Sequence, residues 1–411
     1  MIESFNFSIL EVDKSTLAKG VLGRLKPTQW PLSINDLPNE SVLVGGAVRD
    51  ALLGVVKPSL DLDLVVPMQA VQLTQALADK HDATCVILDM QRDIARLVKE
   101  DWTIDIASRY GTSIEEDLLR RDYTINSIGI TLDSTPNLID PTGGLKDLKN
   151  KKLVAVSENN LIQDPLRLLR GFRLMAEFDL VISTETLYWI QLHSKMLYKV
   201  ASERIQEEIK RIIVASCSGK VIPLIQSSCL LDPWSNKENF FHGEPPNFKN
   251  LSFYSSNELS IAIPLAGLVY LLDDLGIEEL RFSKQTIRKC KLLRKWLKRC
   301  KDNGYLKLKE DEQLSLHKDL EQFLPAFICS LPMKDQFFWL KRWRNNSDTL
   351  FHPSSPIDGI SLQNILGIQS GPGLGKLMNY LCHENAFGRL QNSDEVLQAA
   401  RNWIQHNQTF L

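Results

Sequence analysis

The chain has almost no net charge, which limits what its composition can reveal about its partners. Its 411 residues include 48 lysines and arginines against 50 aspartates and glutamates, for a formal charge of −2. Any basic surface for nucleic acid must therefore be local. Hydrophobic residues at 44% and charged residues at 24% are values of globular proteins, and they exclude a disordered or fibrous chain.

Long hydrophobic runs and paired cysteines are also lacking. The longest strongly apolar run without a charge, 259–272, contains Pro264 and is too short to span a bilayer. The opening MIESFN has no basic-then-apolar pattern, so we expect no signal peptide, no membrane association and a cytoplasmic protein. The scattered cysteines form no C-x-x-C pair, which argues against a zinc site or a disulfide framework.

Changes in pattern along the chain predict an α+β head followed by helical modules. Between residues 40 and 155, short β-type runs such as SVLVGG, LDLVV and TIDIA alternate with helical segments, including a helix over 69–82. Beyond Leu161 long helical periods dominate, and the Pro/Asn-rich segment 230–258 predicts a loop. The expected modules are an N-terminal lead-in with at most a short helix (1–39), the head (40–155), a helical neck (156–229), a helical body (230–350) and a helical tail (351–411).

A pair of aspartates in the head is the first chemical signal. Asp61 and Asp63 stand two residues apart in the run LDLDLVV, so on a strand their carboxylates project from the same face. Two like charges side by side are unfavourable unless a cation lies between them, and carboxylate oxygens are ligands that Mg²⁺ prefers. For an isolated D-x-D, a solvated strand edge is an equally good explanation.

A glycine pair precedes the aspartates. Gly45-Gly46 follows the apolar run VLV and opens a helical segment, which lets backbone amides approach a phosphate, while Arg49 adds positive charge. Alone, this pattern is more often ordinary turn chemistry. Glycine pair, arginine and D-x-D together are typical of a nucleotidyltransferase head, where two Mg²⁺ ions bridge the carboxylates and a triphosphate.

The combined run GGAVRDALLG…LDLDLVV resembles motif A of the class II tRNA nucleotidyltransferases, the family of the CCA-adding enzymes and bacterial poly(A) polymerases. Four later segments resemble the other motifs of this family: DLLRRDYTIN at 117–126, DPTGGLKDL at 140–148, DPLRLLRGFR at 164–173 and SERIQEEI at 202–209. The resemblance implies an α+β fold, with a polymerase-β-type head (a small mixed sheet with helices) followed by an all-helical neck, body and tail.

The resemblance also implies roles for individual residues. Asp61 and Asp63 are the catalytic metal ligands, and the nucleotide-binding residues are Gly45, Gly46, Arg49, Arg121, Asp122, Asn126, Asp164, Arg167, Arg170 and Arg173. Asp122 and Asn126 are four residues apart and are expected to share a helix face, where they offer an acceptor and a donor to a ribose hydroxyl. Asp164 and Arg167 can imitate a base-pairing partner, because a carboxylate accepts and a guanidinium donates in a fork.

Simpler interpretations stay open for these motifs. A salt-bridged helix start explains the Arg120-Arg121 segment, and a solvent-facing ion-pair stripe explains the series from Asp164 to Arg173. Gln163 stands where the family usually has glutamate, which leaves its effect on base selection open. Asp105, on a strand expected near the D-x-D, is a candidate third carboxylate or a strand-edge residue.

Two later segments predict contacts with RNA. Residues 281–301 contain many basic residues and no acid, with an apolar stripe at helical spacing. Beside a nucleotidyltransferase head, this cationic helix is better explained by tRNA phosphates than by a membrane surface or a solvated face. The GPGLGK segment at 371–376 resembles the RNA-binding tail of the family. The predicted RNA-contacting residues are Arg288, Lys289, Lys291, Arg294, Lys295, Lys298, Arg299, Gly373, Gly375 and Lys376.

The prediction is a template-independent, Mg²⁺-dependent enzyme that extends the acceptor end of tRNA from ATP and CTP. Addition of CCA, of A only or of CC only stays open. The compact segment 87–108 resembles that of A-adding relatives, and A addition would depend on a separate CC-adding enzyme. Poly(A) polymerase activity on general RNA is the alternative. A non-catalytic RNA-binding protein predicts a broken D-x-D, and a small-molecule nucleotidyltransferase needs neither the basic helix nor the tail.

Overall fold

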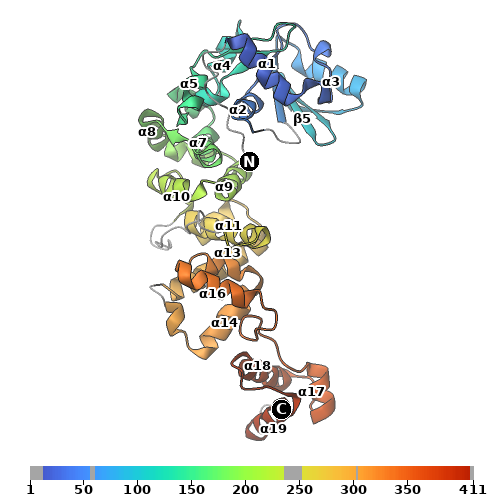
Figure 1. The fold of residues 1–411 in the computed structure, drawn as a ribbon, viewed down its shortest axis with the longest axis vertical. Helices are drawn as coiled ribbons and strands as arrows, with labels where there is room; N and C mark the ends of the chain where they lie inside the picture. The colour runs from blue at the N-terminus through green and yellow to red at the C-terminus, as the bar shows by residue number, and fades with distance from the viewer. Residues whose placement is uncertain (1–12, 56–60, 236–251, 302–303, 408–411) are drawn as a thin grey trace. The chain divides into compact units, whose positions relative to one another are not determined.

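The computed structural model describes residues 13–55, 61–235, 252–301 and 304–407. They form two compact units, 1–200 and 201–411, and Figure 1 colours the first from blue to green and the second from green to red. All the described strands lie in unit 1, and the described part of unit 2 is helical, so the predicted α+β class is confirmed. The division after Val200 falls inside the segment 156–229 that was predicted as one neck. Of the loop predicted over 230–258, residues 236–251 lie outside the described residues.

Unit 1 is organised around a mixed sheet with the strand order β3-β4-β5-β2-β1-β6-β7. Its strands are β1 (Val42–Val44), β2 (Asp61–Val66), β3 (Thr84–Asp89), β4 (Ile94–Lys99), β5 (Trp102–Ser108), β6 (Gly129–Thr131) and β7 (Leu138–Ile139). β2 pairs in parallel with β5 and antiparallel with β1. The central strands are apolar and buried, with Leu43, Leu62 and Leu64 almost without exposed surface, and this fixes β2 in the middle of the sheet.

Five helices accompany the strands of the head in the described residues: α1 (Lys14–Leu25), α2 (Gly46–Leu52), α3 (Ala70–His81), α4 (Ile114–Leu118) and α5 (Gly144–Lys149). The helix predicted over 69–82 is therefore confirmed. The lead-in is more than a short appendage, because α1 is capped by Asp13 and buries Leu17, Val21 and Leu25. These residues share one helix face, and α1 packs through it against α2 and β7.

The chain leaves the sheet through elements that still belong to unit 1. They are β8 (Lys152–Leu153), α6 (Glu158–Gln163), α7 (Leu166–Phe178), β9 (Val181–Ile182) and α8 (Thr184–Leu192). Leu166, Leu169 and Phe172 are buried and form part of the core side of α7. Arg167 and Arg170 of the same helix are only partly buried.

Unit 2 is built from helices throughout its described residues. They are α9 (Ser202–Val214), α10 (Ser218–Ser227), α11 (Ser256–Leu271), α12 (Asp274–Glu279), α13 (Lys284–Arg299), α14 (Glu310–Leu320), α15 (Leu324–Ile328), α16 (Met333–Trp343), α17 (Gly359–Leu366), α18 (Pro372–Ala386) and α19 (Ser393–His406). The last three share a small core that includes Leu362, Leu377 and Leu381.

No described helix combines the length and apolarity needed to cross a bilayer. None of the seven cysteines, all of which lie in the described residues, takes part in a disulfide.

Gly171 makes the packing of α7 on the head testable. A Cβ built on Gly171 would lie 2.2 Å from the hydroxyl oxygen of Tyr123, which is fully buried and donates to the Arg167 carbonyl oxygen. Gly171→Ala should therefore lower the free energy of unfolding by about 1–3 kcal/mol through overpacking, measured by denaturant titration. In the control Gly20→Ala on α1, nothing lies within 4 Å of the new Cβ. That change should stabilise the helix by up to about 1 kcal/mol, and equal effects of the two substitutions would contradict the packing described.

Candidate active site

The paired aspartates occupy the edge of β2 that lies beside the glycine turn. Asp63 is the register partner of Val44, the residue that ends β1 immediately before Gly45. Asp61 is exposed and accepts a hydrogen bond from the Thr103 hydroxyl on β5. Since the two aspartates alternate with buried Leu62 and Leu64, both carboxylates lie on the same face of the strand, as predicted.

Gly45 meets two separate demands. Its φ of 77° lies in the left-handed region that favours glycine. A Cβ at this position would also lie 2.6 Å from Asp63 Oδ2 and 3.2 Å from Arg121 Nη1. The absence of a side chain at Gly45 therefore lets a carboxylate and a guanidinium pack against the backbone, in the space that a Cβ would fill. Gly46 begins α2 next to this space.

The electrostatics of Asp63 favour a bound cation. Burial raises the pKa of Asp63, and the negative charges of Asp105 and Asp61 raise it further, while Arg121 and Arg170 act in the opposite direction. A carboxylate that is costly to ionise in isolation gains most from a divalent cation. The two carboxylates on one face of β2 fit Mg²⁺, which is commonly held by one or two protein carboxylates together with substrate phosphates.

Asp105 does not complete this pair as a third ligand. It is the register partner of Asp63 on β5, but both of its oxygens accept hydrogen bonds from Arg96, at 2.6 and 2.9 Å. Within the described residues no group of three acidic, histidine or cysteine side chains is arranged to hold a metal. Among the described residues, Asp61 and Asp63 therefore remain the candidate donors of the site.

Arg49 is not the phosphate ligand that the sequence predicted. It is 5% exposed, and its Nε and Nη2 donate to Asp50 Oδ1 at 2.9 and 2.6 Å. Its Nη1 donates to Asn126 Oδ1 at 2.5 Å, and its guanidinium lies 4.4 Å from the centre of the Phe178 ring. A guanidinium with these partners joins α2 to α7 and to the segment of Asn126, so its role is structural.

Asp122 and Asn126 meet through a turn instead of along a helix face. Only Thr124–Asn126 is helical, as a single 3₁₀ turn, but Asn126 Nδ2 still donates to Asp122 Oδ1 at 3.0 Å. Both side chains are buried, and Asn126 Oδ1 is occupied by Arg49. The predicted hydrogen bonds of this pair to a ribose are therefore replaced by hydrogen bonds within the protein.

Asp122 is the charged centre of a buried network. Its Oδ1 also accepts from the Tyr123 amide at 2.8 Å, and its Oδ2 lies 3.1 Å from Arg170 Nε. Burial raises the pKa of Asp122, but the charges of Arg170 and Arg167 and the hydrogen bond from Asn126 outweigh burial, and the pKa lies below its usual value. Asp122 is thus a carboxylate anion that holds Arg170 of α7 against the head.

Arg121 and Arg167 remain at the site with part of their surface exposed. Arg121 Nη2 lies 3.4 Å from Asp117 Oδ2, and its Nη1 points to the space beside Gly45. Arg167 Nη1 donates to the carbonyl oxygens of Arg120 and Asn160 at 3.0 and 2.9 Å, which fixes the guanidinium. Burial lowers the pKa of Arg167, although Asp122 and Asp164 oppose this effect.

The four residues predicted to act together around α7 differ in their burial. Asp164, Arg167 and Arg170 are partly exposed, whereas Arg173 is buried. Asp164 ends α6 and accepts from the Leu166 amide at 3.3 Å, so it lies one turn from Arg167. Arg170 is half-exposed and paired with Asp122. Arg173 is buried and its Nη1 donates to Glu177 Oε2 at 2.9 Å, which gives it a structural role instead of the predicted support of the nucleotide.

Asn160 is a positioning residue that the sequence reasoning missed. Its Nδ2 donates to the carbonyl oxygens of Leu119 and Arg121, each at 2.8 Å, while its own carbonyl oxygen accepts from Arg167. Asn160 thus ties the backbone at Arg121 to the guanidinium of Arg167. Its only signal in the sequence is one asparagine among the polar residues ENN that open α6, which is too common to single out.

The predicted basic helix is confirmed as α13, but acidic side chains of its neighbours neutralise much of it. Lys291, Lys295 and Arg299 pair with Glu278, Asp319 and Glu312 at 2.6, 2.8 and 2.7 Å. Arg294 is 4% exposed, with hydrogen bonds to Asp274 and the Leu272 carbonyl oxygen, so it is not available to RNA.

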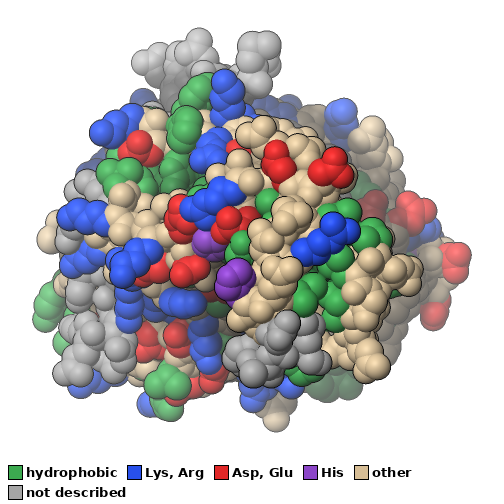
Figure 2. Space-filling view, turned by 90° about the horizontal axis from the view of Figure 1, so that it is seen from below, with side chains coloured by type: hydrophobic (Ala, Val, Ile, Leu, Met, Phe, Trp, Pro, Cys, Tyr) green, Lys and Arg blue, Asp and Glu red, His purple; other side chains and the backbone are tan. Residues whose placement is uncertain are grey.

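The surface of unit 2 agrees with this partial neutralisation. Figure 2 shows lysine and arginine side chains next to aspartate and glutamate on the face that it presents, without a large area of one sign. The predicted RNA contacts on α13 that are exposed include the ion-paired Lys291, Lys295 and Arg299 as well as Arg288 and Lys298. Lys289 is partly buried and lies 5.7 Å from the centre of the Phe323 ring.

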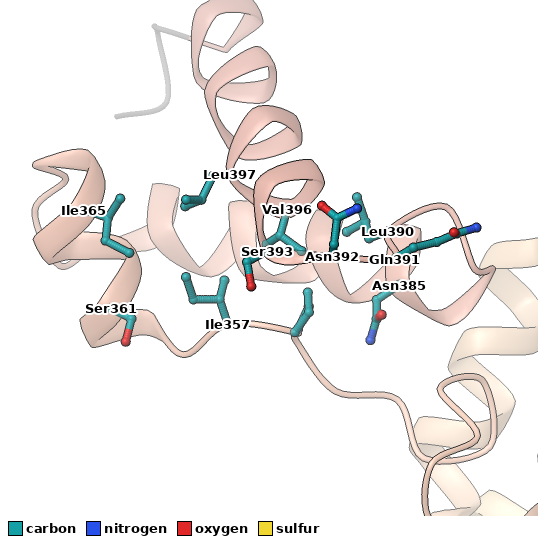
Figure 3. Close-up of a pocket in the computed structure, with 11 residues that line it drawn as sticks. Ile357, Ser361, Ile365, Asn385, Leu390, Gln391, Asn392, Ser393, Val396 and Leu397 are labelled. Atoms are coloured by element: carbon teal, nitrogen blue, oxygen red, sulfur yellow. The ribbon is translucent and has the colours of Figure 1, made fainter.

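In the tail, the predicted glycines lie at the start of α18. Gly373 is buried, while Gly375 and Lys376 are exposed in the first turns of the helix. A cavity of about 450 Å³ lies elsewhere in the tail, between the segment that contains Ile357, helix α17 and the start of α19 (Figure 3). The predicted residues do not line this cavity, so the two features of the tail are separate.

Known proteins are similar to this chain in two ways, over the head alone and over nearly its whole length. The family model described as the poly A polymerase head domain matches residues 41–154. The CC-adding tRNA nucleotidyltransferase of Synechocystis sp. is 29% identical over 399 residues, covering 91% of this chain and 96% of that protein. The CC-adding tRNA nucleotidyltransferase of Geobacter sulfurreducens is 39% identical over 172 residues, covering 41% of this chain and 39% of that protein.

A solved structure shows the same fold over nearly the full length. The Thermotoga maritima CCA-adding enzyme complexed with tRNA has a TM-score of 0.69 and 22% identity, covering 98% of this chain and 97% of that one. The head match, the near full-length relative and this fold agree with the motifs found in the sequence. In its head, its fold and its motifs the chain is similar to the class II tRNA nucleotidyltransferases, the family of the CCA-adding enzymes.

Proposed function

We propose that the chain extends the 3′ end of tRNA without a nucleic-acid template, using nucleoside triphosphates and releasing pyrophosphate. The observation that carries this proposal is the convergence of Asp61, Asp63, the backbone at Gly45 and Arg121 on one side of β2. Two carboxylates beside a guanidinium and a close backbone suit a metal–triphosphate complex. The relatives named for CC addition and the structural neighbour solved with tRNA support tRNA as the acceptor.

The reaction joins the 3′ hydroxyl oxygen of tRNA to the α-phosphorus of the nucleotide and breaks the bond to the β-phosphate, so pyrophosphate leaves. Asp61 and Asp63 hold Mg²⁺ in this proposal, and bound Mg²⁺ eases deprotonation of the hydroxyl and neutralises the leaving charge. Arg121 contributes a fixed positive charge beside the carboxylates. Gly45 and Gly46 let the phosphates approach the backbone closely.

Base selection falls to Asp164 and Arg167 at the junction of α6 and α7. The two backbone carbonyl groups that hold Arg167 Nη1 fix the plane of its fork. A fixed donor fork beside a carboxylate acceptor presents hydrogen-bonding groups of the kind that a base edge recognises. The adjacent Gln163 is exposed at the end of α6, so the glutamine changes the charge next to this pair without altering the fold.

Among the possible products, we propose addition of the two cytidylates. The relative that aligns over nearly the whole chain and the relative that is 39% identical over 172 residues are both named as CC-adding enzymes. Addition of adenylate alone, which the segment 87–108 favoured, has no such support. Poly(A) synthesis on general RNA stays the alternative, because the matching head model bears that description.

The first test offers the purified protein and Mg²⁺ three tRNA transcripts, ending at the discriminator base, at C and at CC, with CTP, ATP or both. We expect the first transcript to gain two cytidylates, the second to gain one and the third to stay unextended. Extension of all three to CCA indicates a complete CCA-adding enzyme. A single adenylate on the CC transcript indicates an A-adding enzyme, and long adenylate tails on any RNA indicate a poly(A) polymerase. No incorporation would overturn the proposal.

A second test concerns Arg167. Arg167→Ala should reduce the preference for CTP over ATP by about 10- to 100-fold, the equivalent of one hydrogen bond from a charged group, while the Kd for tRNA stays unchanged. The measurement compares kcat/KM for the two nucleotides and the Kd for labelled tRNA. Arg92→Ala is the matched control, because Arg92 is an exposed arginine of the same unit that pairs only across a surface turn. An unchanged nucleotide preference in Arg167→Ala refutes the assigned role.

A further inference from the structure

Unit 2 contains a second cavity, of about 220 Å³, between the turn Gly304–Lys307 and helices α14 and α16. Aromatic rings form much of its wall. The Tyr305 and Trp339 rings meet edge to face at 6.0 Å, and Trp339 and Phe351 meet in the same way at 5.3 Å. Protein interiors rarely leave such a space between large apolar side chains, so a suitable occupant would gain contacts on several sides.

One polar side chain in this wall lacks a partner. His317 on α14 is 2% exposed, and its Nδ1 makes no hydrogen bond with any residue that the structure describes. Its ring lies 4.1 Å from that of Phe351 and 5.4 Å from that of Trp339. Burial and the nearby charge of Arg342 lower the pKa of His317 to about 3, so the imidazole is neutral. A buried nitrogen without a hydrogen bond is unfavourable, and a ligand that supplies one gains affinity.

The cavity presents no unbalanced charge to a ligand. Arg342 donates from Nε and Nη2 to the two oxygens of Asp348 at 2.7 and 3.0 Å. The Tyr305 hydroxyl donates to Asp335 Oδ2 at 2.6 Å. A phosphate would find no free cation here, whereas an uncharged planar ring would find stacking surfaces and a hydrogen-bonding nitrogen. The volume is below that of a pocket for a drug-sized molecule and limits the occupant to about one ring system.

The mouth of the cavity suits a ring that belongs to a longer RNA chain. Leu306 lines the cavity and is 71% exposed, and Lys307 next to it is also exposed. Proteins that bind single-stranded RNA combine aromatic rings, on which the bases stack, with nearby cations that contact the phosphates.

We propose that this cavity binds the base of an unpaired nucleotide of the RNA substrate, stacked on the aromatic wall and hydrogen-bonded to His317. The assignment rests on the proposed function for the presence of RNA. It adds a contact for RNA in unit 2 that does not depend on the neutralised charges of α13.

The test measures the Kd for labelled tRNA and the kcat of nucleotide transfer at saturating tRNA. His317→Phe keeps a ring but removes the nitrogen, and Leu306→Trp narrows the mouth at an exposed position. Each should weaken tRNA binding about tenfold, the effect of losing one stacked base, with kcat unchanged. The matched control is Leu275→Trp on α12, because Leu275 is also an exposed leucine of unit 2. It should leave the Kd unchanged.

The outcomes separate this inference from the proposed function. If the wild-type protein transfers nucleotides but Leu306→Trp binds tRNA as Leu275→Trp does, the base site is refuted and the enzymatic proposal stands. If no transfer occurs, the Kd measurements still test RNA binding at the cavity by themselves. A last experiment adds free cytidine or adenosine to the protein and measures the NMR signals of the His317 side-chain nitrogens. If these nucleosides shift the signals while the variants bind tRNA as the wild type does, the cavity binds free nucleosides or nucleotides. That result would contradict the proposal that the bound base belongs to the RNA substrate.

Discussion

The active-site side of unit 1 depends on one buried charge, the carboxylate of Asp122. A buried anion is tolerated only when hydrogen bonds and an opposite charge compensate for lost hydration. Asp122 obtains them from the Tyr123 amide, Asn126 and Arg170, which belong to the head and to α7. Because loss of Arg170 would leave a buried charge without its counter-ion, and loss of Asn126 would leave it without a hydrogen bond, the head and α7 are held in one arrangement.

That arrangement sets the positions of the chemical groups. Arg121 immediately precedes Asp122, and Asn160 holds the backbone on that side, so the Arg121 guanidinium lies beside Asp63. One turn before Arg170 on the same helix, Arg167 is fixed by the carbonyl oxygens of Arg120 and Asn160. Arg49 supports the same network from α2 through Asn126. A set of buried polar contacts thus keeps the carboxylates of β2 and the donor fork of α7 within one rigid unit.

The sequence predicted the local features and missed most long-range ones. Period-two alternation was enough to place Asp61 and Asp63 on one strand face, and helical spacing identified α3, α7 and α13. The partners of charged residues were not predictable in this way. Arg49 pairs with Asn126, and Arg299 on α13 pairs with Glu312 on α14, through tertiary packing that joins segments distant in the chain. Arginines that looked alike in the motifs therefore separate into structural residues, such as Arg49 and Arg173, and residues at the site, such as Arg121 and Arg167.

The most direct measurement concerns the two carboxylates of β2. Asp61→Asn and Asp63→Asn remove the charge that is proposed to hold Mg²⁺ while keeping the size of the side chain. The account predicts that each lowers kcat for nucleotide transfer by about three orders of magnitude or more, with the Kd for tRNA unchanged. Asp101→Asn, at an exposed aspartate in the turn before β5, should behave as wild type. Substantial turnover in either Asp61→Asn or Asp63→Asn at saturating Mg²⁺ would contradict the assignment of the metal site.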